Sequence, residues 1–312
     1  MDAARRPAPA ADYYFPPGRS IARRIHGERV VGVLYGPRAL ILGALEPLTY
    51  TATMISTNSI DRPFRRLART AKIHETVLLG TREEADRALK AVNQLHRRVE
   101  GNLDEPAGKH PAGTRYSAFD QDLMLWTLAV IVDSARAIYE TMVRPLSESE
   151  LELLWQDYML FGELFGMSRS AMPASFREFD SWLTKQMSSQ DLGPTAHGLA
   201  MAPIVAFEQP VPIVGRPMLH LNNLAVKGTL PRHVRDEFGI RWTAAHQAGF
   251  RTLVLINRLA SRLLPRRLRR GRNNVLFDNV IRAEARRGGT VVADLSQPSP
   301  DGRVATVRRD EP

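Results

Sequence analysis

The sequence contains no cysteine. A chain without thiols has no disulfide to hold its fold together and no thiolate to bind zinc, an iron–sulfur cluster or haem iron. Any metal or haem must therefore be bound through His, Asp, Glu, Met, Tyr or Lys. The absence of cysteine also fits a reducing compartment, so we expect a cytoplasmic protein.

Long apolar runs are also absent. The two longest span residues 39–45 and 123–132, well short of the roughly 20 residues that cross a bilayer as a helix. Residues 1–17 are rich in Ala, Pro and Tyr, and no apolar run follows Arg5 and Arg6. We therefore expect a disordered N-terminal tail rather than a signal peptide.

Acidic residues are scarce in one segment. The net charge is +10, and eleven arginines lie between Arg251 and Arg287, against only Asp278 and Glu284. Nearly all of the positive excess is therefore local. The simplest interpretation is a solvated helix end, and the next is peripheral contact with an anionic membrane. Nucleic acid is the least favoured partner, because no aromatic residues are interspersed among the arginines.

Helical periodicity dominates the remainder of the chain. Thr81 and Glu84 form a capping box ahead of a helix that we expect to reach Val99. Asp120 or Asp122 is expected to cap a strongly apolar helix, and Ser147 to begin the capped helix after it. The sequence lacks the alternation of strands and helices that would indicate a nucleotide-binding sheet. We predict an all-α protein with one helical-bundle domain of about ten helices and a buried cofactor pocket over residues 18–262. A basic, partly disordered extension over residues 263–312 would follow, peripheral from Asn273 onward. Pro37 is expected in a first helical turn, and Pro47 is expected to kink the helix that follows. Other expected helices span residues 19–33, 38–60, 64–79, 123–143, 147–165, 175–187, 191–206 and 231–260.

Four short blocks in the first half occur in a characteristic order. Together they resemble the haem-dependent oxygenase family that contains the bacterial rubber oxygenases and the fungal mpaB enzymes, over about residues 30–170. The blocks are Gly36-Pro-Arg-Ala-Leu-Ile-Leu followed by Pro47, Pro63-Phe-Arg-Arg-Leu-Ala-Arg-Thr70, Leu95-His-Arg-Arg-Val-Glu-Gly101, and Tyr116-Ser-Ala ahead of Asp120, Asp122 and Leu125-Trp126.

The resemblance implies a b-type haem held between helices. Carried over by position, His96 would be the proximal iron ligand, and Arg66 and Thr70 would match the distal arginine and threonine of the family. Arg69 stands where rubber oxygenases can place a lysine. Because a guanidinium does not ligate iron, the distal side would be open or water-bound. Trp126 and Tyr116 are either core residues or flank the flat cofactor.

The residues themselves support these roles and also allow simpler ones. His96 shares an apolar stripe with Val92 and Val99, which suits a neutral imidazole ligand but equally a packed core histidine. Arg66 and Thr70 lie on one helical face. An arginine there would bind an anion such as a haem propionate, or it would be solvated or ion-paired with nearby glutamates.

Two histidines that are familiar in this family are replaced here by Glu46 and Leu128. A buried Glu46 would act in proton transfer or, as the favoured interpretation, form an ion pair with Arg66 or Arg69. A non-haem iron site of His96, His74 and Glu46 is an alternative to haem.

The sequence thus predicts a haem b-dependent oxygenase that uses dioxygen on an apolar, isoprenoid or lipidic substrate. The alternative from another class is a non-catalytic helical protein that has lost the cofactor and acts by protein or lipid contacts. The replacements at Glu46 and Leu128 motivate this second hypothesis.

Overall fold

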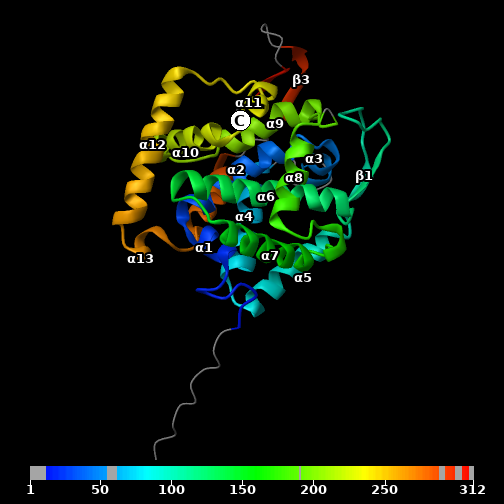
Figure 1. Cartoon of the computed structure of the whole chain (residues 1–312). Helices are drawn as coiled ribbons and strands as arrows, with labels where there is room; N and C mark the ends of the chain where they lie inside the picture. Colours follow the sequence, from blue (N-terminus) through cyan, green and yellow to red (C-terminus); the bar gives the residue numbers. More distant parts are fainter. Residues whose placement is uncertain (1–11, 55–61, 190, 288–291, 299–303, 309–312) are drawn as a thin grey trace, which may run out of the picture.

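The computed structural model describes residues 12–54, 62–189, 191–287, 292–298 and 304–308. These residues form fourteen α-helices, two short 3₁₀ turns and two antiparallel hairpins (Figure 1). The predicted all-α class is confirmed. No helix within this part of the chain is long and apolar enough to span a membrane.

The elements follow one another in this order: α1 (Ile21–Gly27), α2 (Arg29–Gly43), α3 (Pro47–Met54), α4 (Pro63–Leu79), α5 (Arg82–His96), β1 (Glu100–Asn102), β2 (Arg115–Ser117), α6 (Gln121–Met142), α7 (Glu148–Leu164), η1 (Arg169–Ala171), α8 (Phe176–Met187), α9 (Ala196–Phe207), η2 (Ile213–Gly215), α10 (Arg216–Thr229), α11 (Arg232–Glu237), α12 (Ala244–Leu263), α13 (Arg266–Arg269), α14 (Asn274–Arg287), β3 (Val292–Pro298) and β4 (Val304–Arg308).

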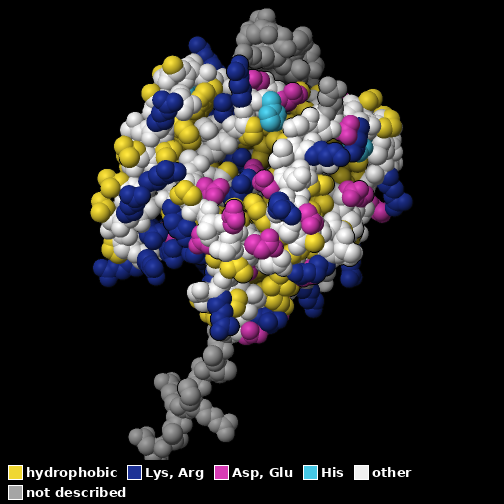
Figure 2. All heavy atoms as spheres, in the orientation of Figure 1, with side chains coloured by type: hydrophobic (Ala, Val, Ile, Leu, Met, Phe, Trp, Pro, Cys, Tyr) yellow, Lys and Arg dark blue, Asp and Glu magenta, His cyan; other side chains and the backbone are white. Residues whose placement is uncertain are grey.

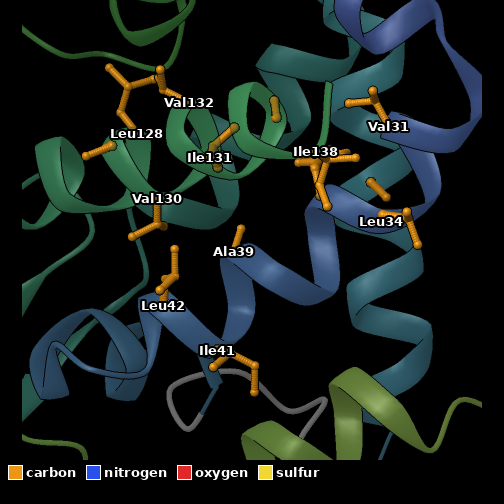
Figure 3. Close-up of a cluster of buried hydrophobic side chains, with 14 of the residues drawn as sticks. Val31, Leu34, Ala39, Ile41, Leu42, Leu128, Val130, Ile131, Val132 and Ile138 are labelled. Carbon is orange, nitrogen blue, oxygen red and sulfur yellow. The ribbon is translucent and has the colours of Figure 1, made fainter. Parts of the chain in front are cut away.

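Helix α6 lies at the centre of the fold and packs along α2. The five consecutive residues from Leu128 to Val132 are all buried, so every side of the helix is covered by other elements. Figure 3 shows Leu42 and Ala39 of α2 facing Val130 of α6, with Ile138 and Leu34 at the other end of the contact. This pair forms the frame against which α4, α7, α9 and α10 pack.

The first helices begin and end at other residues than predicted. The chain breaks at Glu28, which adopts an extended conformation and is buried against Arg269 and Arg270. Helix α2 then runs through Pro37, which was expected in a first turn, and Pro47 begins α3 instead of kinking a longer helix. An ion pair with a distant segment, absent from any local pattern, thus sets the break at Glu28.

Helix starts with local caps lie where the sequence predicts them. The Thr81 side chain accepts from the backbone N–H of Glu84, and the Glu84 carboxylate accepts from the N–H of Thr81. Asp120 caps α6, and Ser147 opens α7 with a second capping box. Each cap satisfies backbone donors that have no partner within the helix.

The expectation of a peripheral chain from Asn273 onward is wrong for α14. The backbone and side-chain amides of Asn273 donate to the fully buried carboxylate of Glu75 on α4. Phe277 and Val280 are buried, and Glu284 accepts from the N–H groups of Phe64 and Arg65 at the start of α4. Helix α14 therefore caps and covers α4, which carries several of the predicted site residues.

Candidate functional site

His96 is the last residue of α5. Its ring is half-buried and meets the edge of Phe119 at a centroid distance of 6.0 Å. The buried Nδ1 atom has no hydrogen-bond partner among the described residues. Burial lowers the pKa of His96, and the positive charge of Arg66 lowers it further. The imidazole is therefore neutral at pH 7, with a nitrogen lone pair available to a metal.

Arg66 lies on α4, one turn from its start. It is largely enclosed, and burial lowers the pKa of Arg66 to about 10, although nearby Tyr50 acts in the opposite direction. The guanidinium remains protonated at neutral pH and is close enough to influence His96 electrostatically. The structure thus brings together two residues, from α4 and α5, that the sequence assigned to one site.

Arg69 and Thr70 continue the same face of α4, but their side chains are exposed. Further along the face, Ile73 is half-buried and Val77 is buried. Arg69 and Thr70 are thus the solvent-exposed part of this face, and the residues that follow them along α4 enter the core. Thr70 lies one turn from Arg66, as the spacing requires, and its role near a cofactor stays a prediction.

Glu46 does not make the ion pair predicted for it. Its Oε1 lies 3.0 Å from Nε2 of His110, and its Oε2 accepts from the backbone N–H of Thr49 at 2.5 Å. Glu46 thus caps α3 and holds the loop between β1 and β2, and its described contacts include neither Arg66 nor Arg69. Proline is favoured at the first position of a helix, so the start of α3 could have been found from Pro47.

Trp126 and Tyr116 are buried in packing positions. The indole N–H of Trp126 donates to the carbonyl of Gly43 at 3.4 Å, which ties α6 to the end of α2. Tyr116 on β2 lies in a small apolar cluster with Val99 and Leu103, its hydroxyl over Gly101. Of the two interpretations left open by the sequence, these contacts support the core one.

The structure adds a buried row of histidines and tyrosines that the sequence did not reveal. Nε2 of His26 lies 2.6 Å from the hydroxyl of Tyr158, and the His26 ring meets the edge of Tyr35 at 4.7 Å. The hydroxyl of Tyr35 is 3.1 Å from Nδ1 of His74. Burial lowers the pKa of His26 to about 3 and that of His74 to about 4, in the latter case with a further contribution from His96.

This row leads toward His96 and is closed by apolar rings. His74 makes edge contacts with Phe161 and Phe165 of α7 and its end. Tyr50, which influences Arg66 electrostatically, has its hydroxyl 3.3 Å from Nδ1 of His197 on α9. Polar groups from α1, α2, α3, α4, α5 and α9 thus lie in one largely buried region, in which burial favours neutral histidines and Arg66 carries a positive charge. None of these pairings is encoded by spacing within one helix.

The donor set of this region can be compared with the two predicted cofactors. The described residues contain no group of three or more His, Asp or Glu side chains placed to hold a metal ion. Glu46 is engaged with His110, so the set of His96, His74 and Glu46 does not fit a non-haem iron site. A single neutral imidazole with an unpartnered buried nitrogen fits haem, because haem iron needs only one axial side chain.

Comparison with known proteins identifies the family of the chain. Residues 23–259 match the family described as the catalytic domain of the ER-bound oxygenase mpaB/B′ and rubber oxygenase. Two uncharacterized proteins, one from Mycobacterium bovis and one from Mycobacterium tuberculosis, are each 28% identical to the chain over 216 residues, which cover 68% of this chain and 80% of theirs. No solved structure matches. The chain belongs to the family of mpaB and rubber oxygenase catalytic domains.

Proposed function

We propose that the chain is a haem b-dependent oxygenase in which His96 provides the protein ligand to the iron. The observation that carries the proposal is the state of His96: neutral, half-buried, with an unpartnered Nδ1 and a protonated arginine beside it. The family match supports an oxygenase domain at the coarser level. Haem, when bound, supplies the iron at which dioxygen chemistry takes place.

His96 can serve as an axial ligand because its pKa is low. A protonated imidazole has no lone pair to offer, and a ligand with a pKa near 7 would lose metal as the pH falls. Burial and the charge of Arg66 both lower the pKa of His96 and so favour the neutral ring. Arg66 therefore acts on the site through His96, by favouring the neutral ring, in addition to any contact of its own with a cofactor.

Arg66 also offers a buried positive charge to an anionic group. A guanidinium in a low-dielectric region binds a carboxylate more strongly than it does in water. The haem propionates are such carboxylates, so Arg66 would orient the macrocycle. The exposed Thr70, one turn along α4, supplies a hydroxyl donor on the same face.

For the substrate we propose an apolar molecule of isoprenoid or lipidic type. Phe119, Phe161 and Phe165 surround the histidines with apolar rings. Such walls bind a hydrocarbon and exclude water. The rubber oxygenases in the family act on a polyisoprene, which supports the same substrate class.

A non-catalytic function is the second candidate. Leu128, where the resemblance leads us to expect a histidine, is buried in the core and packs against Gly162. Glu46, at the other such position, is used as a helix cap. Both positions at which a histidine is expected thus have structural roles here, one in packing and one in helix capping, which favours a member that works without the cofactor.

The deciding experiment is the ultraviolet–visible spectrum of protein purified from haem-supplemented cells, with total iron, for the native chain, His96→Ala and His220→Ala. His220 is exposed on α10 and is the matched control. We expect a Soret band with about one haem per chain, lost in His96→Ala and retained in His220→Ala, with unchanged circular dichroism. Iron without a Soret band would overturn haem binding, and absence of both colour and iron would favour the non-catalytic function.

A further inference from the structure

Helix α12 has two apolar faces, of which the fold covers only one. Phe250, Leu253 and Val254 pack against the main core. On the opposite side, Leu255, Ile256, Leu259 and Leu263 are between 54% and 71% exposed. Residues 255, 259 and 263 are four apart and therefore form a single stripe. We call these four residues the outer face of α12; a helix face that meets only water is normally polar.

The apolar surface continues beyond the end of α12. Leu264 and Leu268 are exposed in the turn that leads through α13. Figure 1 shows α12 along one edge of the molecule, with α13 turning back at its lower end toward α1. Figure 2, in the same orientation, shows hydrophobic and basic side chains side by side along this edge.

The charges around this surface have one sign. Arg251, Arg262, Arg266 and Arg267 are exposed beside it, and the sequence contains no acidic residue between Glu237 and Asp278. An ordinary solvated helix carries both signs. The surface is therefore apolar and strongly basic at once.

A pocket lined by arginines adjoins α13. It has a volume of about 520 Å³ between α1, the end of α4 and the 266–272 segment, and no acidic side chain lines it. Arg24, Arg270 and Arg272 form ion pairs with carboxylates that lie outside the lining. Among the described contacts, Arg19 and Arg266 have no carboxylate partner. Guanidinium groups bind phosphate oxygens in paired hydrogen bonds. The six arginines of the lining are Arg19, Arg23, Arg24, Arg266, Arg270 and Arg272.

We propose that the outer face of α12, the α13 turn and this arginine pocket bind the surface of an anionic phospholipid bilayer. The leucines and Ile256 would enter the interfacial region, and the arginines would bind lipid phosphates. Charge complementarity selects this partner. A second copy of the chain would bring like charges together, and a nucleic acid would leave the apolar stripe in contact with water.

Vesicle flotation tests the proposal with the full-length chain. We expect binding to vesicles of phosphatidylcholine with phosphatidylglycerol, weak binding to phosphatidylcholine alone, and release at high salt. Leu255→Ser/Leu259→Ser/Leu263→Ser and Arg262→Glu/Arg266→Glu should each lower the partition coefficient by about tenfold or more. Leu153→Ser, an exposed leucine on α7, and Arg87→Glu/Arg177→Glu, exposed arginines on α5 and α8, are the matched controls.

Several outcomes would overturn the proposal. Equal binding to neutral and anionic vesicles would contradict the role of the arginines, and equal losses in the control variants would contradict the location of the surface. A dimer that the leucine variant dissociates, without vesicle binding, would assign the surface to a second copy. Salt-sensitive binding of duplex DNA in place of vesicles would assign it to nucleic acid. The readout does not depend on haem, so it is independent of the proposed oxygenase activity.

Discussion

At the scale of single side chains, the electrostatics of His96 depend on a neighbour from another helix. Burial lowers the pKa of His96, and Arg66 on α4 adds to the effect, although the pair is separated by 30 residues in the chain. Arg69, three residues after Arg66, is exposed on the surface of the same helix. The two arginines therefore provide a built-in comparison between an enclosed charge and a solvated one.

Replacing Arg66 should raise the pKa of His96. In Arg66→Gln the buried positive charge is gone, so protonation of the imidazole becomes less unfavourable. The measurement is a titration of the imidazole resonances by nuclear magnetic resonance. Arg69→Gln is the control, and it should leave the titration unchanged because its charge is screened by solvent. Equal upward shifts in both variants would contradict a specific contribution from Arg66.

At the scale of secondary structure, prediction succeeded where the signals are local. The caps at Thr81, Asp120 and Ser147 need only residues within one turn. The break at Glu28 and the docking of α14 depend on partners about 200 residues or more away, so no local pattern contains them. Helix α10 was missed because the prolines before it dominate the pattern of that region.

The same distinction applies to the candidate site. His96 and Arg66 were predicted because both lie in motifs that resemble a known family, and the structure places them in one region. The row of His26, Tyr35 and His74 was not predicted, because three different helices contribute one residue each. A histidine in an apolar stretch is the only signal that the sequence offers for such a row, and by itself it does not identify a partner.

The docking of α14 on α4 gives a prediction at this scale. In Glu75→Ala the buried amides of Asn273 lose their acceptor, which should lower the free energy of unfolding by about 2–3 kcal/mol. Hydrogen exchange should increase in Asn274–Arg287 and at the start of α4, but not in α6. Glu83→Ala, at an exposed position of α5, is the control and should cost less than about 0.5 kcal/mol. Unchanged exchange in α14 would contradict the proposed role of Glu75.

At the scale of the whole molecule, the segment around α13 packs against the region of the first five helices. Glu28 between α1 and α2 binds Arg269 and Arg270, and Arg272 binds Glu84 at the start of α5. Arg270 and Arg272 also line the arginine pocket, while His26 on α1 and His74 on α4 are enclosed by the protein. Because both histidines are buried and neutral, the stability of the whole fold is linked to pH.

The sign of this linkage follows from the two pKa values. His26 and His74 have folded-state pKa values of about 3 and about 4, below the ordinary value of 6.5 that applies when the chain is unfolded. Between pH 7 and pH 5 the unfolded chain therefore takes up protons that the folded chain does not. Their contribution to stability is present above about pH 6.5 and is lost as the pH falls, by about 2 kcal/mol per histidine down to pH 5.

Urea unfolding at pH 7, 6 and 5 should thus show that the free energy of unfolding decreases as the pH falls, in a range where few carboxylates titrate. His26→Gln keeps a hydrogen-bonding group for Tyr158 but cannot be protonated. Between pH 7 and pH 5 the variant should therefore lose less unfolding free energy than the native chain, and the difference should equal the contribution of one histidine. This holds whatever the stability of the variant at pH 7. His220→Ala removes an exposed histidine, and its decrease should equal that of the native chain. If His26→Gln loses stability as steeply as the native chain, His26 is protonated in the folded protein, and the row would have to be a charged one.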